Sequence, residues 1–250
     1  MIRDITLGQY FPGSSAIHRL DARVKITSIF VYIVALFIVG NFVGFAVCAG
    51  AIGVVIAISK VPLSFILRGL KPIFIILFLT FTLNFFMNGW ERAIFLVIRL
   101  VLLIIGSSVL TLTTKPISLT DGIESLLKPL KVFKVPAHEL AMMMSIALRF
   151  IPTLLEETDR IMKAQMARGA DFESGNIFKR AKSLIPILVP LFISAFRIAQ
   201  DLAMAMEARC YKGGEKRTRL YAMKIEKADV FAIVCTTAFL GVVVATGILL

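Results

Sequence analysis

Residues 26–59 read ITSIFVYIVALFIVGNFVGFAVCAGAIGVVIAIS and carry no charged side chain. As one helix, this stretch would measure about 51 Å at ~1.5 Å per residue, whereas the hydrocarbon core of a bilayer is about 30 Å thick. Gly40 and Asn41, near its middle, are residues typical of turns. We therefore expect a hairpin of two membrane-spanning helices, over about 25–39 and 43–59.

More apolar stretches follow toward the C-terminus. Residues 72–90 form a third uncharged stretch, which ends at Trp90, a residue that fits an anchor at the membrane interface. A fourth span covers about 93–113 and is interrupted by Arg99, and a fifth covers 230–250. Since 58% of the 250 residues are hydrophobic, we predict an all-α integral membrane protein with about five transmembrane helices and a cytoplasmic domain of long amphipathic helices.

Two features inside these spans predict how the helices pack. Ala46, Gly50, Gly53 and Ala57 recur at close to four-residue intervals, a pattern that lets two membrane helices approach closely. Arg99 is an ionisable residue at depth, but it lies only about two turns from the outer end of its span. We expect Arg99 to reach the headgroups or to pair within the protein.

The charge distribution predicts the orientation. Lysine and arginine outnumber aspartate and glutamate, giving a formal net charge of +12, and the positive-inside bias accounts for this surplus without a nucleic-acid partner. Cations flank the first hairpin on one side only, at Arg19, Arg23, Lys25, Lys60, Arg68 and Lys71. The N-terminus and residues 114–228 are therefore expected in the cytoplasm. This divides the chain into a membrane domain (1–113), a cytoplasmic domain (114–228) and a final transmembrane helix (229–250).

Three helices are predicted in the cytoplasmic region. The first begins near Ser118 or Thr120, where Ser118-x-x-Asp121 resembles a capping box, and ends near Leu127. The second begins after Pro136, ends near Ala167 and contains Pro152, which is expected to kink it. The third covers about 177–210.

The third of these helices is expected along the membrane surface or packed beneath the spans. Its uncharged segment, Ser183 to Phe196, has only 14 residues and contains Pro186 and Pro190. Such a length is short for a membrane span.

The second and third helices end in the same way. A small residue, an arginine and another small residue close each of them, in Ala167-Arg168-Gly169 and Ala208-Arg209-Cys210. Small neighbours leave a guanidinium accessible, so that it can pair with a carboxylate or with carbonyl groups of another protein. We interpret the two ends as docking points for a separate partner.

The sequence gives no indication of catalysis. It contains no Gly-x-x-x-x-Gly-Lys-Ser/Thr loop for a nucleotide, and Cys48, Cys210 and Cys235 are too far apart for a zinc or disulfide pattern. His18 and His138 are equally isolated. We expect a non-enzymatic protein with no cofactor and no bound metal.

Several motifs resemble those of the T component, the transmembrane coupling protein of energy-coupling factor transporters (the CbiQ-like family). The family's His-x-Leu-Asp-x-Arg-x-Lys motif is similar to the segment that contains His18, Leu20, Asp21, Arg23 and Lys25. Its second cytoplasmic helix resembles residues 147–152, and its paired Ala-Arg-Gly-like motifs resemble the two helix ends. Cys210 departs from the Gly or Ser usual in the second motif. The resemblance spans almost the whole chain.

This resemblance implies a non-catalytic scaffold in a prokaryotic cell membrane. Its partners would be two ABC-type ATPases, which seat Arg168 and Arg209, and a membrane substrate-binding S component that delivers a vitamin or other micronutrient. The S component would contact the apolar coupling helices, with candidate residues Leu184, Pro186, Leu188, Pro190, Phe192 and Phe196. The transported compound would be recognised by that other subunit, not by this chain.

Two alternatives stay open. A self-contained secondary transporter or channel would be expected to carry intramembrane Asp, Glu or His and broken spans; the predicted spans hold only Arg99. A structural membrane anchor for another cytoplasmic assembly is the second alternative, and composition and spacing do not distinguish it from a transporter subunit.

Overall fold

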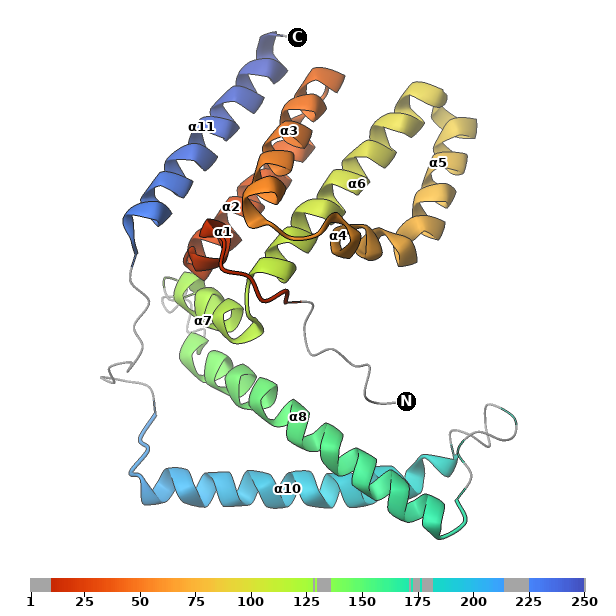
Figure 1. Ribbon diagram of the computed structural model, residues 1–250, viewed down its shortest axis with the longest axis vertical. Helices are drawn as coiled ribbons and strands as arrows, with labels where there is room; N and C mark the ends of the chain where they lie inside the picture. The colour runs from red at the N-terminus through yellow and green to blue at the C-terminus, as the bar shows by residue number, and fades with distance from the viewer. Residues whose placement is uncertain are drawn as a thin grey trace. The chain divides into compact units, whose positions relative to one another are not determined.

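A computed structural model describes residues 10–127, 129, 136–170, 172, 176, 182–213 and 225–249 (Figure 1). All regular elements in these ranges are helices, and none of the residues described is in a strand. The chain divides into two compact units. The bundle unit comprises the described residues of 10–129 and 225–249, and the helix-pair unit comprises those of 136–213.

The bundle unit contains the predicted hairpin. Residues 39–41, around Gly40 and Asn41, separate its two helices, so the predicted turn is confirmed. Trp90 is the first residue of α6 (Trp90–Thr113), directly after Gly89, whose φ of +85° favours glycine. The elements are α1 (Ala16–Arg19), α2 (Ala22–Ile38), α3 (Phe42–Ser59), α4 (Leu63–Leu70), η1 (Lys71–Ile73), α5 (Phe74–Asn88), α6 (Trp90–Thr113), α7 (Pro116–Leu127) and α11 (Lys227–Leu249).

The core of the bundle unit lies between α2, α3, α6 and α11. Leu36 and Cys48 are fully buried there, as is Val243 from the last helix. Outside this core, large apolar side chains face outward: Ile75 is 76% exposed and Phe86 is 81% exposed. A surface of this kind is suited to lipid rather than water.

Close helix packing occurs at different glycines from those predicted. A Cβ atom on Gly106 would lie 2.8 Å from Tyr32 Cε1, so α6 approaches α2 closely there. At Gly50 and Gly53 a Cβ would meet nothing within 4 Å. The predicted contact through Ala46, Gly50, Gly53 and Ala57 is therefore wrong within the described chain, because α3 presents its opposite face, with Cys48, to the core.

The segment after the hairpin and the start of α7 also differ from prediction. Residues 60–71, between the second and third predicted spans, were not expected to be helical and contain α4 (Leu63–Leu70). Helix α7 begins at Pro116, so Ser118 and Asp121 lie inside it and the capping-box assignment is wrong. Proline is well suited to a first helical position because it needs no hydrogen-bond partner there.

The helix-pair unit consists of α8 (Ala137–Ala167) and α10 (Ile185–Ala208), which run in opposite directions and cross at an angle (Figure 1). Both contain an internal proline, Pro152 and Pro190, without a break in the helix. Residues 177–181, where the third cytoplasmic helix was predicted to begin, lie outside the described residues. Two hydrogen bonds join the two helices, from Ser194 Oγ to Glu157 Oε1 (3.3 Å) and from Gln165 Nε2 to the Pro186 carbonyl (3.5 Å). Tyr211, just beyond the end of α10, donates its hydroxyl to Met142 Sδ in α8 (3.0 Å).

Six helices in the described ranges are long and apolar enough to cross a membrane. The all-α membrane class is thus confirmed, although about five spans were expected. The count differs because α8 and α10 also qualify by length and composition, whereas α2 has only 17 residues. The division into 1–113, 114–228 and 229–250 concerns the sides of the membrane and stays a prediction. The six are Phe42–Ser59, Leu63–Asn88, Trp90–Thr113, His138–Ala167, Ile185–Ala208 and Lys227–Gly247.

Candidate functional site

The end of α8 is a Schellman motif, in which backbone amides beyond the helix fold back onto its last carbonyls. Arg168 is the capping residue, and Gly169 follows in the left-handed conformation with φ +87°. The Gly169 amide donates to the Met166 carbonyl and the Ala170 amide to the Gln165 carbonyl, both at 2.9 Å. Gly169 is suited to this conformation because it has no Cβ.

The end of α10 repeats this geometry. Arg209 is the capping residue, and Cys210 occupies the left-handed position with φ +55°. The Cys210 amide donates to the Glu207 carbonyl at 2.8 Å, and the Tyr211 amide donates to the Met206 carbonyl at 3.0 Å. The departure from Gly at position 210 therefore changes the side chain while the backbone motif is kept.

Both arginine side chains are exposed on the surface of the helix-pair unit. Arg168 and Arg209 are exposed, as are Ala167 and Ala208 before them and Cys210. The terminal carbonyls of each helix already accept hydrogen bonds from the Schellman amides, so the guanidinium groups are not needed to cap them. Within the described ranges, neither guanidinium has a hydrogen bond or ion pair. Each can therefore offer its donors to another molecule.

The two arginines lie at opposite ends of the helix pair. Tyr211, two residues after Arg209, donates its hydroxyl to Met142 near the start of α8. Arg168 closes the far end of α8, so the two guanidinium groups are separated by roughly 40 Å of helix at ~1.5 Å per residue. One partner surface for each arginine fits this separation better than a single small ligand.

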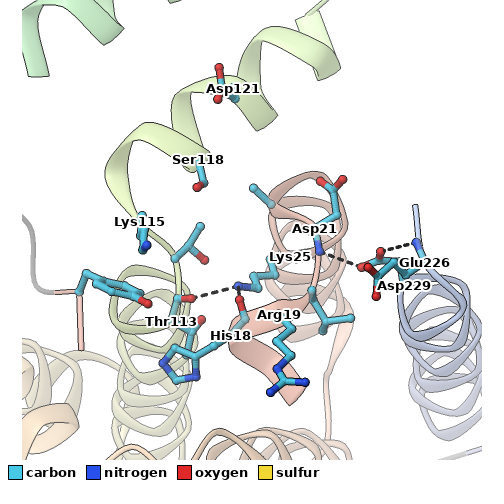
Figure 2. A pocket seen from close by; sticks show the side chains of 14 residues that line it. His18, Arg19, Asp21, Lys25, Thr113, Lys115, Ser118, Asp121, Glu226 and Asp229 are labelled. Carbon is cyan, nitrogen blue, oxygen red and sulfur yellow. Dashed lines mark hydrogen bonds between the residues drawn. The ribbon is translucent and has the colours of Figure 1, made fainter. Parts of the chain in front are cut away.

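The predicted N-terminal motif forms a polar pocket in the bundle unit (Figure 2). Its His18 ring is held on both nitrogens: Nδ1 lies 2.7 Å from Ser15 Oγ and Nε2 lies 3.1 Å from the Phe11 carbonyl oxygen. Burial lowers the pKa of His18 below its usual value, with a further lowering by the charge of Lys25 and an opposing effect of the Phe11 carbonyl. The ring is therefore biased toward its neutral form.

Asp21 and Asp229 join the starts of two helices. The Asp21 carboxylate caps α2 by accepting from the Arg23 amide at 2.9 Å, a common use of Asp at this position. The Asp21 amide donates to Asp229 Oδ1, and the Glu226 amide donates to Asp229 Oδ2, both at 2.8 Å. Asp229, only 2% exposed, thus fixes the start of α11 to the start of α2.

Lys25 completes this cluster from the first turn of α2. Its Nζ donates to the Thr113 carbonyl at 3.0 Å and to the His18 carbonyl at 3.2 Å. Leu20, another residue of the motif, is the C-terminal capping residue of α1. The motif therefore holds α1, the last residue of α6 and the start of α11 around α2, which is a structural role.

Asp229 and Thr113 were not predicted as members of this cluster. They lie 208 and 88 residues from their partners in the sequence. The one sequence signal for Asp229 is that it is an acidic residue in the first turn of an otherwise apolar helix. Thr113 contributes only its backbone carbonyl, which no side-chain pattern could reveal.

Arg99 is paired within the protein, which confirms one of the two alternatives expected for it. Its Nη2 donates to the Val39 carbonyl at 2.9 Å, at the end of α2. The guanidinium carbon also lies 5.7 Å from the ring centre of Phe37, 5.8 Å from that of Phe45 and 5.0 Å from that of Phe95. This charge therefore caps a helix among aromatic rings.

The six residues suggested for the substrate-subunit contact lie in the first half of α10 or just before it. Leu184, Leu188, Phe192 and Phe196 follow one another at four-residue intervals and are exposed by 49%, 47%, 62% and 68%. Pro186 is exposed and Pro190 is half-buried, while Ile187 is buried. The two leucines and two phenylalanines thus form an apolar stripe that nothing in the helix-pair unit covers. In the described part of the chain, no three His, Cys, Asp or Glu residues are grouped to hold a metal.

Comparison with known proteins places these features in a family. Residues 13–220 match the family model CbiQ, described as cobalt transport protein. Relatives from several bacteria carry the name energy-coupling factor transporter transmembrane protein EcfT. That of Thermosediminibacter oceani is 56% identical and the alignment covers 94% of this chain and 95% of the relative; that of Clostridium kluyveri is 56% identical, covering 94% of each; that of Bacillus subtilis is 48% identical, covering 88% and 89%.

Proposed function

The chain belongs to the CbiQ family of cobalt transport proteins and is the transmembrane T component of an energy-coupling factor transporter. We propose that it couples ATP hydrolysis to substrate uptake. In this proposal two cytoplasmic ABC-type ATPases hydrolyse ATP, and the helix pair transmits their movement to a membrane S component. The S component binds a vitamin or other micronutrient and releases it inside the cell. The chain itself carries out no chemistry.

One observation carries the proposal: α8 and α10 end in the same Schellman motif with an exposed arginine at the same position. Two copies of one docking element are what two similar partner subunits require. Each guanidinium can form charge-assisted, bidentate hydrogen bonds with a carboxylate or with backbone carbonyls of its partner. Arg168 and Arg209 are the residues that we assign to ATPase docking, with their neighbours Ala167, Gly169, Ala208 and Cys210.

The spacing of the two ends supports one ATPase for each arginine. A separation of roughly 40 Å, estimated along α8 from Met142 to Arg168, leaves room for a separate small domain of ~30 Å diameter at each end. The hydrogen bond from Ser194 to Glu157 joins the two helices, and the one from Tyr211 to Met142 joins the chain just after α10 to the start of α8. A displacement at one end can therefore be passed along the pair as a rigid movement.

The apolar stripe on α10 is our candidate for contact with the S component. Leu184, Leu188, Phe192 and Phe196 present exposed apolar area on a helix that contacts α8, whereas the neighbouring Ile187 is buried. Such a face needs lipid or another membrane protein to cover it. Movement of the helix pair would then reach the S component directly.

We propose a prokaryotic cell membrane with the N-terminus and residues 114–228 on the cytoplasmic side, as the positive-inside bias favours. The test is cysteine accessibility scanning from Ser183 to Phe196 in intact cells. The topology predicts no labelling from the outer face anywhere in this segment. Labelling from outside at any of its positions would contradict it.

The docking assignment can be tested through a thiol that the chain already has. Cys210 is exposed next to Arg209, whereas Cys48 is buried. In a Cys235→Ser background, a maleimide should label Cys210 readily in the isolated chain and slowly in the assembled transporter. Equal labelling rates in the two states would show that no ATPase covers this helix end.

The alternative of a self-contained secondary transporter is less well supported. Such a protein needs an ionisable group within the membrane that is available to substrate or coupling ions. The Arg99 guanidinium is instead engaged by the Val39 carbonyl and three aromatic rings. Its geometry is that of a structural cap.

A further inference from the structure

A groove in the bundle unit, distinct from the docking ends and the N-terminal motif, lies between α4, η1 and the second half of α6. Its volume is about 450 Å³, and its lining includes Arg68, Gly69 and Pro72 on one side. Helix α4 runs across the direction of α5, which lies alongside α6 (Figure 1). Pro72 at this bend cannot continue the helical hydrogen bonding. The groove is thus built into the fold by the bend.

The wall of the groove on α6 changes from polar to apolar with depth. Thr111, Ser108 and Ser107 lie within roughly 9 Å of the last residue of α6, at ~1.5 Å per residue. Leu103 and Ile104 lie deeper, at roughly 13 to 15 Å. In a membrane-spanning helix, this order places hydroxyl groups near the headgroup level and aliphatic groups at the level of the acyl chains.

The other wall provides positive charge and apolar surface. Arg68 lines the groove, and its guanidinium carbon lies 5.2 Å from the ring centre of Phe65 on the same helix. Lys71, in η1, is exposed next to the lining residue Pro72. On α4, Leu63 is 62% exposed and Leu67 is 58% exposed. Helix α4 therefore has the composition of a segment that lies in the membrane interface.

We propose that this groove binds an anionic phospholipid, with the phosphate at Arg68 and Lys71 and an acyl chain along Leu103 and Ile104. The hydroxyls of Ser107, Ser108 and Thr111 would face the glycerol and ester oxygens. A ligand that is negative at one end and aliphatic at the other matches the groove in charge and in polarity order. A helix of a partner protein would place apolar side chains against the hydroxyls, and a free phosphate would leave the aliphatic floor uncovered.

The test is native mass spectrometry of the full chain in detergent, with added palmitoyl-oleoyl phosphatidylglycerol or phosphatidylcholine. The wild-type chain should retain phosphatidylglycerol and discriminate against phosphatidylcholine. Arg68→Gln should weaken retention of phosphatidylglycerol about fivefold, and Arg68→Gln with Lys71→Gln should weaken it further, as expected for cations at a membrane surface. Arg92→Gln, an exposed cation at the opposite end of α6, is the matched control and should bind as the wild type does.

Equal binding of the two lipids, or equal retention by wild type and Arg68→Gln, would overturn the proposal. A second measurement identifies the occupant in the assembled transporter. A photoreactive benzoylphenylalanine replaces Ser107, which is exposed at the groove. An adduct with phosphatidylglycerol supports the proposal, whereas an adduct with another subunit shows that a protein covers the groove. Neither result depends on how the ATPases dock.

Discussion

Lys25 and Thr113, 88 residues apart in the sequence, are joined by a hydrogen bond of 3.0 Å from Lys25 Nζ to the Thr113 carbonyl oxygen. Thr113 is the last residue of α6, where carbonyl groups have no partner within the helix. A cation at this end also complements the helix dipole. The Lys25 side chain, which is 8% exposed, is thus used inside the protein to close a neighbouring helix.

Lys25→Met should destabilise the bundle. The substitution keeps the length of the side chain but removes both hydrogen bonds from a charged donor, so we expect a loss of about 2 kcal/mol in the free energy of unfolding. Thermal unfolding in detergent measures it, as a lower midpoint temperature. Lys182→Met, the same change at an exposed lysine, is the control. If both variants unfolded at the same temperature, the cluster would have no stabilising role.

Prediction from the sequence was most complete where hydrophobicity alone determines structure. The uncharged stretch 26–59 indicated two helices with a turn at Gly40, and the helix after Pro136 was placed to within a residue at each end. It failed where the outcome depends on which faces meet. The small residues Gly50 and Gly53 are on a face of α3 that the described part of the chain leaves uncovered, because the larger side chains of the opposite face fill the core.

The candidate site was predictable only in part. The residues Arg168 and Arg209 stand out in the sequence because each closes a helix between small residues. That both helix ends have the same backbone geometry could not be predicted, because Cys at position 210 gives no indication of a left-handed conformation. Partners such as Asp229 and Thr113 depend on tertiary packing across the chain, which local patterns do not encode.

Substitutions at the two left-handed positions should have opposite effects. Cys210→Gly should stabilise the end of α10 by about 1 kcal/mol, because a residue with a Cβ is strained at positive φ. Gly169→Ala should destabilise the end of α8 by a similar amount, since space is open there and only the backbone conformation opposes the change. Hydrogen exchange of the last helical turns measures both. Effects of the same sign would contradict the shared motif.

Arg99→Met should destabilise the hairpin more than its position at the edge of a span suggests. The change removes the hydrogen bond to Val39 and the contacts with Phe37, Phe45 and Phe95. We expect a loss of about 2 kcal/mol, typical of a hydrogen bond from a charged donor. Thermal unfolding is the readout, with Arg92→Met at the exposed start of α6 as the control. An unchanged midpoint in Arg99→Met would exclude the capping role.

His18 should make the bundle less stable in acid. Burial lowers the pKa of the folded His18 below its ordinary value, so the unfolded chain binds the proton more readily. Stability is therefore complete above about pH 6.5 and falls as the pH decreases toward the folded pKa. Between about pH 7.5 and about pH 5, the unfolding midpoint of the wild type should fall further than that of His18→Gln. Parallel curves would show that His18 is not the titrating group.

The most direct measurement for the proposed coupling role is the amount of ATPase that co-purifies with the chain from membranes. Replacement of both Arg168 and Arg209 by alanine should reduce it at least about tenfold, because two charge-assisted hydrogen-bonding sites are lost. The matched control replaces Arg160 and Arg197, exposed arginines within the same two helices, and should keep the ATPases. Retention of the ATPases at the wild-type level after loss of Arg168 and Arg209 would contradict the proposed docking role of these two arginines.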